Sequence, residues 1–255
     1  MNTRKSIQAT KKEFEESFST GDFYNKQTQD EAHLNAILEF LPIKAGMKIL
    51  DLGTGSGYLA FAIASKYPDV MVAGLDIVEK TLDCNLERAS KEGYHNLKFV
   101  TYDGIKFPFA EGEFDIVVSR YALHHFPEIH YSISEVNRVL KQDGAFFLSD
   151  PTPNADDSQR FVDAYMQLKK DGHIKFYTTK EWEEICGQNG LELIKSFDSS
   201  IRFPKKRDTA FGFYELLNRY EKEVIAGYEL EIIDDEIYVT EHVNNLLFYK
   251  KRQNK

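Results

Sequence analysis

The feature that most constrains this chain is a glycine-rich turn, which follows a short apolar run and precedes an apolar run typical of a helix. Asp51 stands before the turn, and glycines occupy positions 53, 55 and 57. Glycine adopts positive φ readily and has no Cβ, so a ligand can approach the backbone of such a turn. The N–H groups at the start of the following helix would face the same space. The turn therefore predicts a ligand site between a strand and a helix, with a tight connection that binds nothing as the alternative.

The spacing of the glycines disfavours a dinucleotide. A dinucleotide-binding turn has the pattern G-x-G-x-x-G, which would require glycine where this chain has Tyr58. The negative charge of Asp51 would also repel a pyrophosphate. A cationic ligand suits this turn better.

Apolar and amphipathic runs alternate from Lys44 onward. The expected strands are 47–51, 70–76, 97–101, 114–119 and 144–149, and the expected helices are 57–66, 78–92 and 128–141. Gly93 suits the end of the second helix, and Pro127 suits the first turn of the third. This alternation predicts right-handed crossovers and a parallel sheet covered by helices on both faces. In such a sheet the ligand lies beyond the carboxyl ends of the strands.

Acidic residues follow three successive strands at that edge, namely Asp51, Asp76 and Asp103. A carboxylate at position 76 can accept hydrogen bonds from two ribose hydroxyls. Asp103 can accept one from the exocyclic amine of an adenine, whose faces Ile77 and Ile105 would cover. Each acid alone is more often a helix cap or a solvated loop residue. Three acids beside a glycine turn predict a nucleoside-containing ligand.

Together these motifs resemble the class I S-adenosylmethionine-dependent methyltransferases. Within them, the chain is most similar to the small-molecule branch that includes the menaquinone and ubiquinone C-methyltransferases. The family pattern D-x-G-x-G-x-G is met at 51–57, its second-strand acid at Asp76, D-x-x-x-x-P-F at 103–109 and F-D-x-V-x-S at 114–119. The helix written E-x-x-R-V-L-K-P-G-G appears at 135–144, with Gln-Asp-Gly in place of the last three residues. The resemblance covers roughly residues 40–150.

The resemblance implies an α/β fold, with a doubly wound, Rossmann-like sheet of seven strands whose last strand is antiparallel. It also implies S-adenosyl-L-methionine as the cofactor and S-adenosyl-L-homocysteine as its product. The residues expected to bind the cofactor are Asp51, Gly53, Thr54, Gly55, Gly57, Asp76, Ile77, Asp103, Gly104 and Ser119.

Arg120 and His124 are expected to border the reacting atoms. Histidine suits removal of a proton from the acceptor because its ordinary pKa lies near neutrality. We prefer His124 to His125 for this role, and packing within the loop is the alternative for both. Most of the acceleration is expected from holding the acceptor in line with the methyl group.

Segments outside the matched region predict covers for the site. Residues 1–43 are expected to form an N-terminal helical cap, with helices at 5–20 and 29–41 joined by a linker or flap, and 44–255 to form the methyltransferase domain. A capping box at 178–181 predicts a helix, followed by a strand at 191–199. A helical insertion at 203–230, rich in aromatic residues, precedes a final strand at 237–250. The insertion is either a substrate cover or core, and residues 151–177 are a second candidate cover.

Composition limits the partners. A net charge of −9 and a pI near 5.4 argue against nucleic acid and anionic membranes. The sequence has no apolar run of 18 residues and no signal-peptide pattern, so we expect no membrane insertion and a cytoplasmic location. Cys84 and Cys186 lie far apart without metal-ligand spacing, which predicts reduced thiols and no metal site. The oligomeric state is not predicted.

The expected activity is methyl transfer to a small-molecule acceptor, with its carbon, oxygen or nitrogen atom left open. Enzymes that methylate amino groups of nucleic acids carry an Asn/Asp-Pro-Pro-aromatic run after the fourth strand, where this chain has Ser-Arg-Tyr-Ala at 119–122. Enzymes that methylate cytosine C5 need a cysteine nucleophile near that point, and neither cysteine is placed there. A protein methyltransferase and a non-catalytic sensor of the cofactor stay as alternatives.

Overall fold

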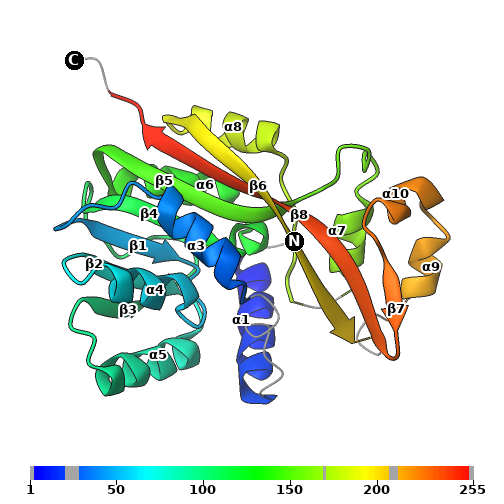
Figure 1. Cartoon of the computed structure of the whole chain (residues 1–255), viewed down its shortest axis with the longest axis horizontal. Coiled ribbons are helices and arrows are strands. Elements are labelled where there is room, and N and C mark those ends of the chain that lie inside the picture. The colour runs from blue at the N-terminus through cyan, green and yellow to red at the C-terminus, as the bar shows by residue number, and fades with distance from the viewer. Residues whose placement is uncertain (1–2, 21–28, 169–170, 207–211, 253–255) are drawn as a thin grey trace.

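The computed structural model describes residues 3–20, 29–168, 171–206 and 212–252, and a twisted sheet lies at its centre (Figure 1). The strand order is β3-β2-β1-β4-β5-β8-β6, and β7 pairs with β8 outside this path. The first five strands, which are parallel, are β1 (Lys48–Leu52), β2 (Met71–Asp76), β3 (Leu97–Thr101), β4 (Phe114–Arg120) and β5 (Leu140–Thr152). Strand β8 (Glu236–Lys250) runs antiparallel to both β5 and β6 (Leu191–Lys206). The predicted doubly wound sheet with an antiparallel last strand is confirmed, and the short β7 (Glu231–Ile233) is one strand more than the seven expected.

Helices cover both faces of the sheet. One face carries α3 (Glu31–Phe40), α4 (Tyr58–Lys66) and α5 (Glu79–Glu92), and the other carries α6 (Ile129–Val139) and α8 (Thr179–Gln188). Each face has its own hydrophobic core, with Phe61 buried in the first and Trp182 in the second. Gly93 ends α5 in the left-handed conformation, and Thr178 opens α8 with the predicted capping box. Pro127 lies one residue before the N-cap of α6, outside the first turn where we expected it.

Strands β6 and β8 extend beyond the other strands and carry a third hydrophobic core, which we call the C-terminal lobe (Figure 1). The lobe comprises α7 (Phe161–Met166), α9 (Phe213–Leu217), α10 (Lys222–Ala226), β7 and the outer halves of β6 and β8. The sixth strand was expected to end at Ser199, but it continues to Lys206 because each residue up to that point pairs with β8. The predicted insertion at 203–230 thus contains the end of β6 and two short helices, while 207–211 lie outside the described residues.

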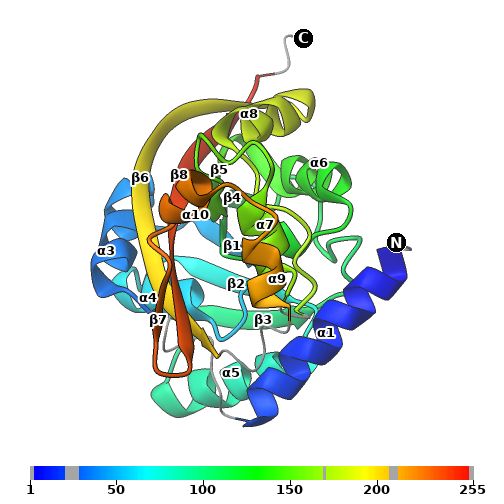
Figure 2. The same ribbon diagram turned by 90° about the vertical axis from the view of Figure 1, so that its right-hand side faces the viewer.

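Helix α1 (Thr3–Thr20) lies across the carboxyl ends of the first strands (Figure 2). Its Ile7 side chain reaches Gly104, and its Thr10 side chain reaches Gly172. Helix α3, by contrast, belongs to the core of the sheet, where Ile37 and Leu38 are buried. The expected linker or flap at 21–28 lies outside the described residues, and the domain division at 43/44 stays a prediction.

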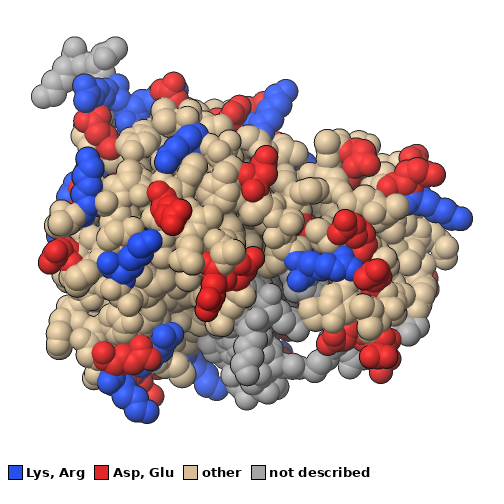
Figure 3. Space-filling model, viewed as in Figure 1, with Lys and Arg blue, Asp and Glu red and all other residues tan. Residues whose placement is uncertain are grey.

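The distribution of surface charge and the apolarity of the helices are relevant to the expected lack of nucleic-acid and membrane partners. On the described part of the face in Figure 3, basic side chains are interspersed with acidic ones and form no extended patch. None of the helices in the described part of the chain combines the length and apolarity that crossing a bilayer requires.

Candidate active site

The glycine turn between β1 and α4 is held in left-handed backbone conformations. The φ angles are 69° at Gly53, 49° at Gly55 and 78° at Gly57. A Cβ added to Gly53 would lie 2.4 Å from the Cβ of Ala122, and one added to Gly57 would lie 2.7 Å from the Phe61 ring. Around Gly55, no described atom lies within 4 Å of such a Cβ. Gly53 and Gly57 are therefore required because neighbouring side chains leave no room for a Cβ. The backbone of Gly55 is exposed to open space.

Asp51 holds this turn from beneath. Its Oδ2 accepts hydrogen bonds from the Thr54 hydroxyl at 2.6 Å and from the Ala60 N–H at 3.2 Å. Burial raises the pKa of Asp51 to about 6, while the two hydrogen bonds and the nearby Arg120 act in the opposite direction. We expected this acid to contact the ligand directly. In the structure its carboxylate accepts hydrogen bonds from the glycine turn, at Thr54, and from the start of α4, at Ala60.

Asp76 joins the glycine turn to the segment that leads into α5. Its carboxylate accepts hydrogen bonds from the Gly55 N–H at 2.9 Å and from the Val78 N–H at 3.0 Å. Burial raises its pKa, and the backbone hydrogen bonds partly offset this effect. A carboxylate has about four lone-pair sites, so these two bonds leave capacity for ligand hydroxyls.

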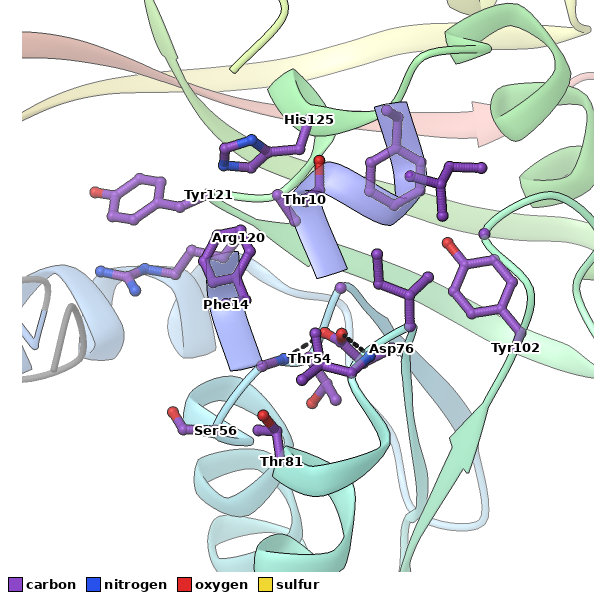
Figure 4. A pocket seen from close by; sticks show the side chains of 18 of the residues that line it. Thr10, Phe14, Thr54, Ser56, Asp76, Thr81, Tyr102, Arg120, Tyr121 and His125 are labelled. Atoms are coloured by element: carbon purple, nitrogen blue, oxygen red, sulfur yellow. Dashed lines mark hydrogen bonds between the residues drawn. The ribbon is translucent and has the colours of Figure 1, made fainter. Parts of the chain in front are cut away.

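A cavity opens where β1, β2, β3 and β4 end (Figure 4). The predicted site residues that line it are Gly53, Thr54, Gly55, Asp76, Ile77, Gly104 and Arg120. The lining residues that we did not predict are Ile7, Thr10, Phe14, Gln29, Ser56, Tyr58, Val78, Thr81, Tyr102, Tyr121, Ala122, His125, Phe126 and Pro127. Five predicted residues lie outside the lining, namely Asp51, Gly57, Asp103, Ser119 and His124.

Asp103 and Ser119 are engaged by the protein itself. The exposed Asp103 carboxylate accepts hydrogen bonds from the backbone N–H groups of Ile105 and Lys106, at 2.9 and 3.0 Å. The buried Ser119 hydroxyl donates to the carbonyl of Leu52 at 2.9 Å. Both side chains shape the ends of strands, and neither lines the cavity.

The chain after β4 makes a strained turn at the cavity wall. Tyr121 has a φ of 54°, which is costly for an aromatic residue and is typical of functional sites. Its N–H donates to the carbonyl of Ser149 at 2.8 Å, which fixes the turn against β5. The short 3-10 helix η1 (Leu123–His125) follows, so its successive side chains point in different directions.

The two histidines of η1 have different surroundings, and the cavity lining contains His125 but not His124, which we preferred as the base. His124 is 1% exposed, and its Nδ1 lies 2.8 Å from a carboxylate oxygen of Asp150. Burial raises the pKa of Asp150 to about 8. His125 lines the cavity and packs edge-on against the Phe14 ring, with 5.3 Å between ring centroids. Adjacent histidines in one turn cannot share a direction, and the sequence carries no signal that tells which one faces the cavity.

His125 is held neutral by its surroundings. Burial lowers its pKa to about 3, with further contributions from His124 and His173 that outweigh the attraction of Asp171. The imidazole makes a hydrogen bond to the backbone of Gly172, and its Nδ1 has no partner among the described residues. A neutral imidazole that donates through Nε2 keeps a lone pair on Nδ1, so His125 can accept a hydrogen bond.

Helix α1 supplies a wall of the cavity that sequence motifs do not mark. Ile7 lies over Gly104, where an added Cβ would be 2.9 Å from the Ile7 side chain. Phe14 lies two turns further along the same helix, against His125. The apolar stripe of this otherwise polar helix was the available signal, because such a stripe must be buried against something.

The cavity fits the nucleoside sulfonium that the resemblance implies. The Asp76 carboxylate has capacity for hydrogen bonds from hydroxyl groups, and Ile77, Tyr102 and Gly104 line the same cavity. The buried Thr81 hydroxyl borders the same space and has no hydrogen-bond partner among the described residues. Within the described part of the chain, no group of three or more His, Cys, Asp or Glu residues is arranged to hold a metal ion.

Comparisons with known proteins agree with this geometry. The model of the methyltransferase domain family matches residues 43–190, which is more than half of the chain. An uncharacterized methyltransferase of Bacillus subtilis, YcgJ, is 30% identical over 62% of this chain and 62% of its own length. Its crystal structure superposes with a TM-score of 0.76 and 24% identity, and covers 88% of this chain and 100% of that chain.

Two further relatives have named activities. A sterol 24-C-methyltransferase of Gibberella zeae, ERG6B, is 32% identical over 71% of this chain and 48% of its own length. The demethylmenaquinone methyltransferase of Lactococcus lactis is 28% identical over 48% of this chain and 54% of its own length. The alignments thus span between 48% and 62% of the length of these three curated relatives.

The matched segment contains the glycine turn, Asp76 and the wall formed after β4. The chain therefore belongs to the methyltransferase domain family.

Proposed function

We propose that this enzyme methylates a small, mainly apolar acceptor that carries a hydroxyl group on or next to the reacting atom. The observation that carries the proposal is the composition of the cavity wall. Phe14, Tyr121, Phe126 and Pro127 contribute apolar surface to this wall, and His125 contributes a neutral nitrogen beside Phe14. Aromatic walls with one placed polar group are typical of sites for small ligands.

The cofactor would occupy the remainder of the cavity, where it supplies a methyl group activated by a sulfonium. Asp76 would accept hydrogen bonds from the ribose, and the backbone at Gly55 would lie against the amino-acid part. Tyr102 and Ile77 would pack against the adenine, beneath Ile7 of α1. These residues bind and orient, and none of them needs to react.

His125 would orient the acceptor by accepting a hydrogen bond from its hydroxyl group. An imidazole whose pKa lies near 3 is a weak base, so we assign it positioning ahead of full proton removal. Positioning of a nucleophile in a dry site can itself supply about 7–11 kcal/mol of the barrier reduction. The apolar walls would exclude water from the reacting atoms.

The curated relatives support the apolar class of acceptor. The names of two of them specify a sterol and demethylmenaquinone, which are both bulky and largely apolar. Neither acceptor is assigned to this chain.

A panel of acceptors tests the proposal. The enzyme is incubated with S-adenosylmethionine and, separately, a quinol or phenol with an apolar ring, a sterol, a small alkyl amine and a lysine-containing peptide. S-adenosylhomocysteine is then measured by mass spectrometry. We expect product with the hydroxylated ring compound. Turnover of the amine or peptide alone would refute the proposed class. Tight cofactor binding without turnover of any acceptor would favour the sensor.

The variant His125→Gln tests the positioning role. We expect a loss of about tenfold or more in kcat/KM for the hydroxylated acceptor, with cofactor affinity little changed, because glutamine cannot place its acceptor atom where Nδ1 lies. His125→Phe, which retains the apolar surface, should lose more than the glutamine variant. Equal activity of both variants and the unaltered enzyme would contradict the role of His125.

A further inference from the structure

Arg120 lies on the side of the cavity opposite Tyr102, where the adenine is proposed to bind (Figure 4). It is the last residue of β4, and its guanidinium packs against Tyr58, the first residue of α4. Its guanidinium carbon lies 4.7 Å from the centroid of the Tyr58 ring and 4.0 Å from the centroid of the Tyr121 ring. Tyr58 directly follows the glycine turn, so the guanidinium is held beside the start of α4.

The charge of Arg120 acts on several titratable groups at this end. It opposes the effect of burial, which raises the pKa of Asp51, Tyr58 and Tyr121. It also adds to the effect of burial in lowering the pKa of His33, whose ring stacks on Tyr121 from α3 at 6.1 Å between centroids. Arg120 therefore contributes positive charge at this end, where Asp30 acts in the opposite direction on Tyr58, Tyr121 and His33, and Asp76 contributes a carboxylate to the cavity wall.

The proposed positions of the adenine and the ribose in the cavity determine which part of the cofactor extends towards Arg120. In the cofactor placement proposed above, the adenine end lies at Tyr102 and Gly104, which line the cavity, and Asp76 accepts hydrogen bonds from the ribose. The amino-acid part of S-adenosylmethionine must therefore extend in the other direction, past Thr54 and Ser56. It terminates in an ammonium group and a carboxylate, and a planar guanidinium matches a carboxylate in both charge and shape.

We propose that Arg120 binds the carboxylate of the cofactor and so selects ligands that carry the complete amino acid. This inference rests on the cofactor orientation proposed above and is independent of the acceptor class. The rings of Tyr58 and Tyr121 pack against the guanidinium and restrict its position, which reduces the entropy lost when the carboxylate binds. This role also accounts for the strained backbone of Tyr121, because its left-handed conformation places the Tyr121 ring against the guanidinium of Arg120.

The test compares three ligands that differ only at this end. Calorimetric titrations use S-adenosylhomocysteine, its decarboxylated analogue and 5′-methylthioadenosine, which lacks the amino acid. Each ligand is titrated into the unaltered enzyme, Arg120→Gln and Arg120→Lys. We expect Arg120→Gln to weaken S-adenosylhomocysteine by about 10- to 100-fold and the other two ligands by less than about threefold. The affinity of Arg120→Lys for S-adenosylhomocysteine should lie between those of the unaltered enzyme and Arg120→Gln, because lysine keeps the charge and loses the planar guanidinium.

The outcomes separate this role from the alternatives. An equal loss for all three ligands would show that Arg120 only supports the cavity, and would overturn the proposal. Unchanged cofactor affinity with a raised KM for the acceptor would assign the arginine to the acceptor, and would also overturn it. If Arg120→Gln does not fold, the lysine variant and the ligand series on the unaltered enzyme decide, because a preference below about threefold for the carboxylate-bearing ligand refutes the inference.

Discussion

At the scale of single residues, two acids that follow neighbouring strands make different use of their carboxylates. Asp76 accepts two backbone hydrogen bonds and still borders the cavity, whereas Asp103 is exposed and accepts both of its hydrogen bonds from its own turn. The sequence places both acids at strand ends and gives no sign of this difference.

We expect Asp76→Ala to weaken S-adenosylhomocysteine binding by about 10- to 100-fold, because hydrogen bonds from ribose hydroxyls to a charged acceptor are lost. Asp103→Ala is the matched control and should change affinity less than about threefold. Calorimetric titration measures both, and circular dichroism checks that each variant is folded. Equal affinities of the two variants would contradict the ribose assignment of Asp76.

Asp51 makes stability depend on pH. Its folded-state pKa of about 6 exceeds the ordinary value of 3.8, so the folded state binds the proton more tightly than the unfolded state. Ionisation of this group therefore lowers the free energy of unfolding as the pH rises through this range. Because an asparagine side chain cannot ionise, we expect the stability of Asp51→Asn relative to the unaltered protein to increase by roughly 2 kcal/mol between pH 4.5 and 7.5. Urea denaturation at both pH values measures this difference, and a difference that is independent of pH would contradict it.

At the scale of elements, α1 contacts both ends of the cavity through one face. Ile7 lies over Gly104, at the proposed adenine end, and Phe14 lies against His125, at the proposed acceptor end. The helix also contacts the chain segment after α7, where Thr10 meets Gly172. A single shift of α1 would therefore change both binding regions, which supports the prediction that the N-terminal segment covers the site.

Two substitutions on α1 should have different effects. Ile7→Ala should weaken cofactor binding by a few-fold, because it removes apolar surface from the adenine end. Phe14→Ala should mainly raise the KM for the acceptor, because it removes the ring beside His125. Lys12→Ala is the control, since its side chain is 77% exposed. Steady-state kinetics and calorimetric titration measure these effects, and identical changes in Ile7→Ala and Phe14→Ala would contradict the division.

Local sequence patterns predicted the βα units well. Each strand or helix buries one apolar face, and the period of the apolar residues within that element is enough to show this face. The glycine turn was equally readable, since positive φ and close packing at Gly53 and Gly57 require glycine. The docking of α1 was not predictable, because the surface that receives Ile7 and Phe14 comes from distant strands. The outer half of β6 was also missed. Pro204 disfavours a strand in sequence, yet it is tolerated at an edge where no further described strand follows.

At the scale of the whole molecule, the sheet and the C-terminal lobe share two strands. Strand β8 adds Ile237 and Val239 to the core of the lobe and Leu246 and Phe248 to that of the sheet, and β6 pairs with it alongside both. Tyr228 anchors the lobe further, because it is fully buried and its hydroxyl donates to Asp157 at 2.7 Å. The lobe therefore cannot lose its structure without exposing part of the sheet.

We expect heat and denaturant to unfold the sheet and the lobe in one transition, because their cores are joined through continuous strands. The fluorescence of Trp182, the single tryptophan, reports on the core beneath α8. Hydrogen exchange at the Thr240 N–H, which donates to the carbonyl of Tyr228, reports on the lobe. Both signals should give the same free energy of unfolding, and exchange in the lobe at a much lower free energy would contradict a single transition.

The position of β8 has a consequence for synthesis of the chain. Strand β6 is translated well before β8, whose first residue is Glu236, yet β8 is its only partner in the described sheet. Until β8 has been translated, the backbone N–H and C=O groups of β6 lack their partners outside the ribosome. Unpaired strand edges of this kind can pair with strands of other chains. The exposed charges of Glu192 and Lys195 and the proline at 204 interrupt that edge. Ribosome-bound chains that stop before residue 236 should thus be the form of this enzyme most in need of a chaperone.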